Sequence, residues 1–122
     1  MTVHATIYHN PSCGTSRNVL AALREAGADV TIIEYLKTPP DRKALENLLG
    51  KMGKGVRDIL RRRGTPYDDL GLDDSKLADD RIFAAIAAHP ILIERPIVEI
   101  GTRAALCRPS ETVHELLRQA AG

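Results

Sequence analysis

Residues 3–36 read VHATIYHNPSCGTSRNVLAALREAGADVTIIEYL and contain a complete pattern of strand, helix and strand. Residues 3–8 are short, apolar and β-branched, which is typical of a strand, and residues 30–36 repeat that composition. From Thr15 the apolar side chains recur with the helical period until Gly27 provides a stop signal. A strand, a helix and a strand within about 35 residues form a βαβ unit, so we predict that the two strands are parallel.

The segment that follows is predicted to be helical. Pro39-Pro40-Asp41 opens it, and two helices are indicated by apolar residues at helical spacing, the first by Leu45, Leu48, Leu49 and Met52 and the second, before Gly64, by Val56, Ile59 and Leu60. Residues 66–71 are predicted to form one short helical turn. A further helix contains Ile82, Phe83 and Ile86; Asp79 caps it and His89-Pro90 ends it.

The C-terminal part returns to strands. Residues 96–100 and 104–107, joined by a turn at Gly101, are predicted to form a β-hairpin, and Ser110 begins a last helix. The element order is then βαβ, a helical block, and ββα. We therefore predict an α/β fold with a thioredoxin-like layout and an inserted helical block, as one domain over residues 1–122.

The composition excludes several classes of protein. The formal net charge is +1 and only four residues are Tyr or Phe, which argues against a nucleic-acid partner. The first residues lack the basic and apolar regions of a signal peptide, and no apolar run approaches the roughly 20 residues that cross a bilayer. We expect a cytoplasmic protein without a membrane partner, in which Cys13 and Cys107 are thiols. No Cys/His cluster has zinc spacing, so no metal is expected.

The loop before the first helix reads Tyr8-His9-Asn10-Pro11-Ser12-Cys13-Gly14-Thr15-Ser16-Arg17 and carries the candidate nucleophile. The first turn of a helix has unpaired N–H groups and a partial positive charge, which favour the thiolate of Cys13 and bind an oxyanion. Gly14 keeps the approach free of a side chain. A protonated His9, four residues upstream, is expected to lower the thiol pKa further.

The spacing around Cys13 excludes two other kinds of cysteine site. A C-x-x-C pair is absent because Ser16 stands at its second position, and a C-x5-R phosphatase loop is absent because Val19 stands where it requires arginine. An oxidised sulfur at Cys13 must therefore be resolved by Cys107 or by an external thiol. The alternation around Cys107 favours a packed strand residue.

The Cys13 loop resembles the active-site loop of the glutaredoxin-linked arsenate reductases. The motifs that extend this resemblance over nearly the whole chain are His9 to Arg17, Ile33 to Pro40, Tyr67 with Leu70-Gly71-Leu72, His89 to Val98, and Leu106 to Glu111. Residues 99–105 depart from the family pattern, in a hairpin of variable length outside the motifs. The resemblance implies that Cys13 attacks arsenate, that glutathione is the co-substrate, that glutaredoxin is a partner, and that no cofactor is bound.

The resemblance also implies that Arg61, Arg95 and Arg108 bind the substrate oxyanion. Twelve of the seventeen basic residues are arginine, whose planar fork suits an oxyanion better than the point charge of lysine does. On sequence alone, Arg61 also fits a solvated helix end and Arg108 a salt bridge, whereas Arg17 is expected to be structural. Arg95 precedes Pro96, where a cis bond is usual in thioredoxin-like folds.

The mechanism implied by the family starts with attack of the Cys13 thiolate on arsenate, followed by reduction of arsenic by glutathione, removal of glutathione by glutaredoxin, and release of arsenite. Two alternatives remain open at this point. One is a general glutathione-dependent thiol reductase, and the other is a non-enzymatic thioredoxin-like transcription regulator. Regulators of that type favour a C-x-x-C loop, so Ser16 and His9 count against the second alternative.

Overall fold

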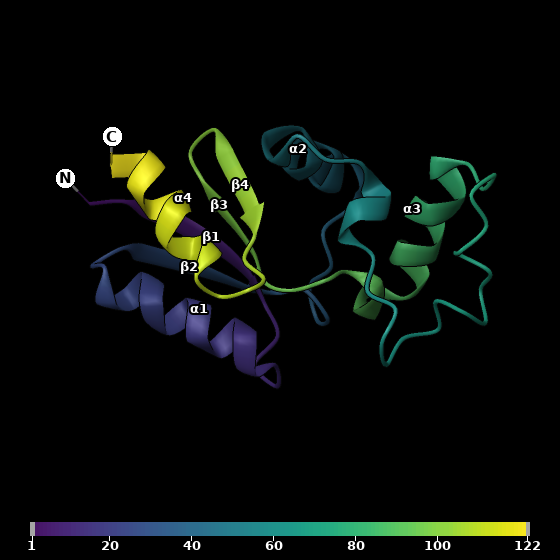
Figure 1. Ribbon diagram of the computed structural model, residues 1–122, viewed down its shortest axis with the longest axis horizontal. Coiled ribbons are helices and arrows are strands. Elements are labelled where there is room, and N and C mark those ends of the chain that lie inside the picture. Colours follow the sequence, from purple (N-terminus) through teal and green to yellow (C-terminus); the bar gives the residue numbers. More distant parts are fainter. Residues whose placement is uncertain (1, 122) are drawn as a thin grey trace.

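The computed structural model describes residues 2–121, and its centre is one mixed four-stranded sheet (Figure 1). The strands β1 (His4–His9), β2 (Asp29–Glu34), β3 (Ile97–Ile100) and β4 (Arg103–Leu106) have the spatial order β2-β1-β3-β4. β1 and β2 are parallel, whereas β3 is antiparallel to both β1 and β4. The predicted βαβ unit and the predicted hairpin are therefore both confirmed.

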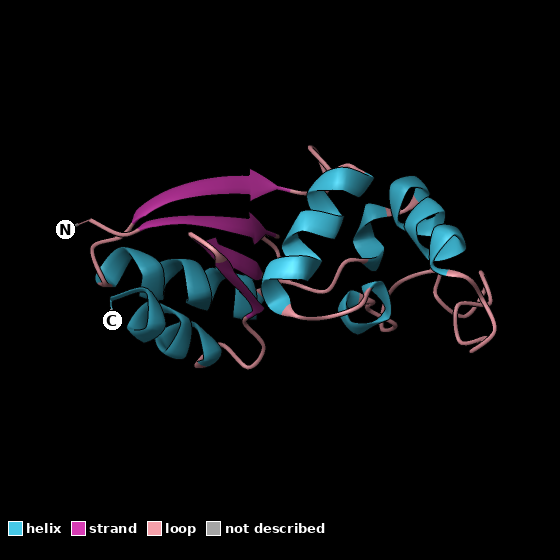
Figure 2. Cartoon of the chain, turned by 90° about the horizontal axis from the view of Figure 1, so that it is seen from above, coloured by secondary structure: helices cyan, strands magenta, loops and turns pink. Residues whose placement is uncertain are grey.

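The helices divide into two groups. Their bounds are Gly14–Glu25 for α1, Arg42–Met52 for α2, Asp79–Ala88 for α3 and Thr112–Ala121 for α4, with short 3-10 helices at Val56–Ile59 (η1) and Pro90–Leu92 (η2). α1 and α4 lie side by side on one face of the sheet. The inserted helices form a separate block at one end of the strands (Figure 2). This layout agrees with the predicted thioredoxin-like fold with a helical insertion.

The short helical turn predicted at residues 66–71 is present, with Leu70 N–H donating to the carbonyl of Pro66 four residues earlier at 2.9 Å. One detail of the helical block was predicted wrongly, the cap of α3. The N-cap of α3 is Ala78, whose side chain cannot cap, so Asp79 is the first helical residue. Its carboxylate still stands at the positive end of the helix, where a negative charge is favourable.

Alternation along the strands separates the core into two parts. Ile7, Val98 and Cys107 face α1 and α4, whereas Tyr8 and Ile97 face the helical block. Side chains of successive strand residues point to opposite faces, so each strand contributes to both parts. The carboxyl end of β1 and the amino end of β3 consequently meet between the two apolar clusters. None of the helices within residues 2–121 is long and apolar enough to cross a membrane.

Candidate active site

Cys13 lies directly after the β1 loop, at the N-cap of α1. Its backbone is extended, with φ −96° and ψ 122°, and its carbonyl accepts the first helical hydrogen bond from Arg17 N–H at 3.0 Å. The thiol is partly exposed. The predicted position at the start of a helix is confirmed, with the helix beginning at Gly14.

Buried polar side chains hold the loop in shape. The hydroxyl of Ser16 lies 2.6 Å from His9 Nδ1 and accepts the backbone N–H of Asn10 at 3.1 Å. All three of these residues are buried. Asn10 in turn accepts the N–H of Ser12 through its side chain at 2.9 Å and the N–H of Cys13 through its carbonyl at 3.0 Å. The position of the sulfur is thus fixed by a continuous hydrogen-bonded loop.

The imidazole of His9 is one of the buried polar groups of the loop. Burial lowers the pKa of His9, which favours its neutral form at neutral pH. The ring of His9 is hydrogen-bonded to Ser16, and the predicted effect of a protonated His9 on the thiol pKa stays a prediction. His9 supports the loop residue whose backbone N–H contacts the sulfur.

Several groups converge on the Cys13 sulfur. Burial alone would raise the pKa of this thiol, but the backbone N–H of Ser16 and the guanidinium groups of Arg95 and Arg108 outweigh burial and lower the pKa from 9.0 to about 7. Arg108 Nη1 lies 3.8 Å from Sγ. Because all three groups are donors that favour an anion, they stabilise the thiolate at neutral pH.

Arg95 stands at the start of β3, before a cis bond to Pro96. Its Nε and Nη1 atoms are buried and have no hydrogen-bond partner at normal distance among residues 2–121. The hydroxyl of the buried Tyr35 lies near the Arg95 guanidinium and donates to the carbonyl of Ile93 at 3.3 Å. Buried donors without acceptors are costly, so a ligand oxygen that accepts from Arg95 would be favoured.

Arg61 is brought to the site by backbone pairing between its segment and the segment that precedes Arg95. Leu60 and Ile93 form an isolated antiparallel bridge, and the Arg61 N–H donates to the carbonyl of Leu92 at 2.7 Å. The side chain is largely buried and donates from Nη1 to Glu94 Oε1 at 2.8 Å. Arg61 is therefore not a solvated helix end, and it lies against the segment that carries Arg95.

Arg108 follows β4 and faces Cys13 from the far side of the hairpin. Its Nη1 donates to the carbonyl of Arg95 at 3.2 Å, and its Nε lies 3.9 Å from Glu94 Oε1. The three predicted arginines are thus brought together. Arg95 and Arg108 act directly on the thiol, and Arg61 joins them through Glu94. Arg17 donates to the carbonyl of Pro11 at 2.9 Å, which agrees with its predicted structural role.

Cys107 is fully buried in the core between the sheet, α1 and α4. Burial raises the pKa of this thiol to about 12. A thiol in this surrounding is inert at neutral pH. The predicted packing of Cys107 is confirmed, although the residue lies directly after β4 and not within it.

Other candidate positions contribute less to the geometry. A Cβ on Gly14 would meet only Arg17 Nη2, at an ordinary contact distance of 3.7 Å. The protein itself therefore has room for a side chain at this position, and the predicted role of Gly14 is to leave space for the substrate. Within residues 2–121 no three His, Cys, Asp or Glu side chains gather as they would around a metal ion.

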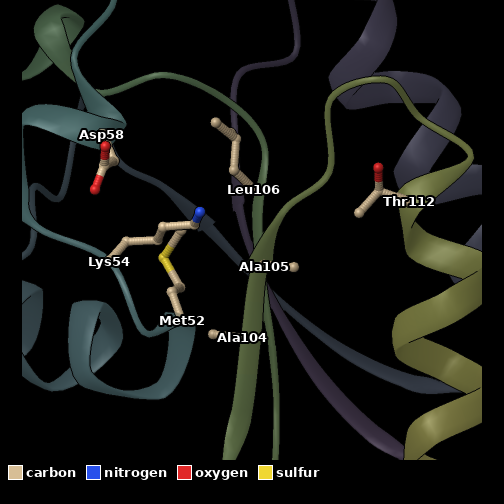
Figure 3. Close-up of a pocket in the computed structure, with 7 residues that line it drawn as sticks. All are labelled: Met52, Lys54, Asp58, Ala104, Ala105, Leu106 and Thr112. Atoms are coloured by element: carbon tan, nitrogen blue, oxygen red, sulfur yellow. The ribbon is translucent and has the colours of Figure 1, made fainter.

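A cavity of about 430 Å³ lies between the end of α2 and the edge strand β4 (Figure 3). Its lining consists of Met52, Lys54, Asp58, Ala104, Ala105, Leu106 and Thr112. Neither Cys13 nor any of the three arginines is part of this lining, so the cavity is distinct from the thiol site.

Sequence reasoning missed three residues of the site. Ser16 entered only as the residue that breaks a C-x-x-C pair, although its position in the first helical turn marks a donor to Cys13. Glu94 carried one available signal, a carboxylate directly before a predicted anion-binding arginine. Tyr35 lies at the end of the second predicted strand, and nothing in the local sequence indicates its proximity to Arg95.

The chain is similar over most of its length to known proteins. The model of the ArsC family matches residues 8–116. The arsenate reductase of Escherichia coli (strain K12) is 54% identical over 117 residues, which cover 94% of this chain and 82% of that protein. The arsenate reductase of Rhizobium meliloti (strain 1021) is 52% identical over 119 residues, 96% of this chain and 82% of that protein.

The solved structure of an arsenate reductase from Vibrio cholerae superposes with a TM-score of 0.89 at 43% identity, covering 94% of this chain and 98% of that one. A second solved structure, described as a putative arsenate reductase from Yersinia pestis, gives a TM-score of 0.86 at 41% identity, covering 91% and 98%. The family match includes the Cys13 loop and the positions of Arg61, Arg95 and Arg108.

Proposed function

The chain belongs to the ArsC family of arsenate reductases, and we propose that it reduces arsenate with Cys13 as the nucleophile and glutathione and glutaredoxin as the source of electrons. The observation that carries this proposal is a thiol with a lowered pKa beside the guanidinium groups of Arg95 and Arg108. Arg108 lies 3.8 Å from the sulfur, and two buried nitrogens of Arg95 are unpaired among residues 2–121. Such a site attracts an oxyanion and supplies a nucleophile beside it.

The first step is attack of the Cys13 thiolate on the arsenic atom. Arsenate carries about two negative charges near neutral pH, and forked donors from Arg61, Arg95 and Arg108 offset them. One oxygen of arsenate takes up a proton and leaves as hydroxide or water, and a Cys13–arsenic bond forms. The unpaired N–H groups at the start of α1 bind a second oxygen.

The electrons come from two external thiols. The thiol of glutathione displaces a second oxygen and bonds to arsenic. A glutaredoxin thiolate then attacks the glutathione sulfur, a disulfide forms between them, and the electron pair of the sulfur–arsenic bond stays on arsenic. Arsenic(V) thereby becomes arsenic(III). Water cleaves the bond to Cys13, and arsenite and the free thiol are released.

The test is formation of arsenite by the purified protein with arsenate, glutathione, glutaredoxin and a nicotinamide-linked recycling system. We expect Cys13→Ser to abolish turnover and Cys107→Ala, which removes the buried thiol, to retain it. Arsenite formation that survives in Cys13→Ser would exclude the proposed nucleophile. Full turnover without glutathione would exclude the proposed electron source.

One variant separates arsenate reduction from general thiol transfer. Arg61 is absent from the groups that lower the pKa of Cys13. Arg61→Ala should therefore leave the reaction of Cys13 with a small disulfide unchanged while it strongly reduces arsenate turnover. Equal loss of both reactions would contradict a role of Arg61 in binding the oxyanion.

A further inference from the structure

We propose that Glu94 is a positioning residue of this site, whose carboxylate orients the guanidinium groups of Arg61 and Arg108 toward the oxyanion. The inference rests on the proposed role of these arginines in binding arsenate. It adds a residue of opposite charge to a site that otherwise consists of cations and a thiol.

One oxygen atom of Glu94 lies next to groups from all three arginines. Oε1 accepts from Arg61 Nη1 at 2.8 Å and from the backbone N–H of Arg95 at 3.3 Å, and it lies 3.9 Å from Arg108 Nε. The Glu94 side chain is only 19% exposed, and those of Arg61 and Arg108 are 16% and 35% exposed. An ion pair shielded to this extent is screened less by salt than an exposed one.

The contacts fix the direction of each guanidinium group. Arg61 donates from Nε to the carbonyl of Arg63 at 2.9 Å and from Nη1 to Glu94. Arg108 is placed by a hydrogen bond from Nη1 to the carbonyl of Arg95, and its Nε lies 3.9 Å from Glu94 Oε1, an ion-pair contact longer than a hydrogen bond. Because the guanidinium is planar, the two hydrogen bonds of Arg61 also fix its third nitrogen. In both arginines Nη2 has no hydrogen-bond partner in the described part of the chain and is free for a ligand.

Glu94 also reduces the positive charge near Cys13. The groups that face the sulfur are the Ser16 N–H and the guanidiniums of Arg95 and Arg108, with the phenol of Tyr35 in the same surrounding. Within residues 2–121 the carboxylate of Glu94 pairs with the guanidiniums of Arg61 and Arg108, and its contact with Arg95 is to the backbone N–H. It limits the repulsion among three cations when no oxyanion is bound, and it opposes the stabilisation of the thiolate.

Two substitutions separate orientation from charge. Glu94→Ala removes both, and we expect the KM for arsenate to rise about tenfold, as loss of a charge-assisted hydrogen bond predicts, with a change in kcat below about threefold. Glu94→Gln keeps an oxygen acceptor for Arg61, so KM should rise less. In both variants the titration midpoint of Cys13 should fall, because the carboxylate that pairs with Arg108, one of the groups that lower the pKa of this thiol, is removed.

The control is Asp68→Asn. Asp68 pairs with Arg62 at 2.6 Å in an exposed ion pair next to Arg61 in sequence. This variant should keep the KM, the kcat and the Cys13 midpoint of the parent protein. Arsenate KM is measured by arsenite formation, and the midpoint by the pH dependence of iodoacetamide alkylation.

A parental KM and a parental midpoint in Glu94→Ala would overturn the proposal. A lower melting temperature of Glu94→Ala with an unchanged KM and an unchanged Cys13 midpoint would also overturn it, because the ion pair would then contribute only to stability. The alkylation assay needs neither arsenate nor glutathione. The two proposals can therefore fail separately. If Cys13→Ser still forms arsenite while Glu94→Ala has a shifted midpoint, the proposed function is wrong and the electrostatic effect of Glu94 on Cys13 is retained.

Discussion

Removal of the Arg108 guanidinium should make Cys13 a weaker acid by an amount that the structure sets. Nη1 lies 3.8 Å from the sulfur, and the Arg108 side chain is about one-third exposed. Two unit charges at about 4 Å attract by about 1 kcal/mol in water and about 4 kcal/mol at an effective dielectric constant of 20. The exposure places this pair near the lower end, at about 1–2 kcal/mol, which corresponds to about one pH unit.

The pKa of Cys13 in Arg108→Ala is therefore expected to rise from about 7 to about 8. At pH 7 the ionised fraction falls from about one-half to about one-tenth, whereas above pH 9.5 both proteins are almost fully ionised. A less acidic thiol is also a better nucleophile once ionised, so the plateau rate of the variant should be slightly higher. The midpoint of the profile, and not the rate at a single pH, is the quantity to compare.

The assay is iodoacetamide alkylation of Cys13 between pH 5 and pH 10, followed by mass spectrometry, at about 0.1 M salt to limit differences in screening. Arg62→Ala is the matched control, since Arg62 pairs with Asp68 and is absent from the groups that act on the thiol. Arg108→Lys keeps a positive charge, so its midpoint should stay near that of the parent while its arsenate KM rises. A parental midpoint in Arg108→Ala would refute the electrostatic account of the thiol.

Three further predictions concern stability and reactivity. Ser16→Ala should lower the free energy of unfolding by about 1–3 kcal/mol in denaturant titration, because buried His9 and Asn10 each lose a partner, while the Cys13 midpoint is kept by the backbone N–H at position 16. Cys107 should resist iodoacetamide below pH 9 in the folded protein, and labelling there before unfolding would contradict its burial. Because folding lowers the pKa of Cys13, its thiolate stabilises the folded state fully above pH 9 and loses that effect as the pH falls through 7. The difference in unfolding free energy between the parent and Cys13→Ser should decrease over the same range, and a difference that grows toward low pH would reverse the assigned sign.

The sheet could be predicted from the sequence because its signals are local. Apolar alternation and the Gly27 stop lie within the elements that they define, and the observed strand bounds differ from the predicted ones by one or two residues. The contacts that hold the helical block together could not be predicted, because they join residues that are distant in sequence. Arg57 donates to the carbonyls of Leu72, Asp74 and Leu77, 15 to 20 residues away.

The site likewise has one part that local sequence predicts and one part that depends on contacts distant in sequence. The position of Cys13 follows from the strand, loop and helix around it, and local sequence is sufficient to find it. The contact between Arg61 and Glu94 spans 33 residues and depends on the bridge between Leu60 and Ile93, which no spacing in the sequence reveals. The family resemblance named the arginines but gave no indication of the carboxylate between them. The burial of His9 likewise depends on the packing of the whole loop and could not be predicted from its neighbours in sequence.

The two cysteines of this chain provide an internal comparison of what determines thiol reactivity. Burial raises the pKa of Cys107 to about 12, whereas Cys13 has a pKa of about 7. Burial acts in the same direction on both thiols, so the opposite outcome at Cys13 depends on the Ser16 N–H, Arg95 and Arg108. A thiol that stays protonated in the core cannot attack an oxidised sulfur or an arsenic adduct at Cys13. In the proposed mechanism the second thiol therefore comes from outside the chain, which supports the proposal of glutathione for that step.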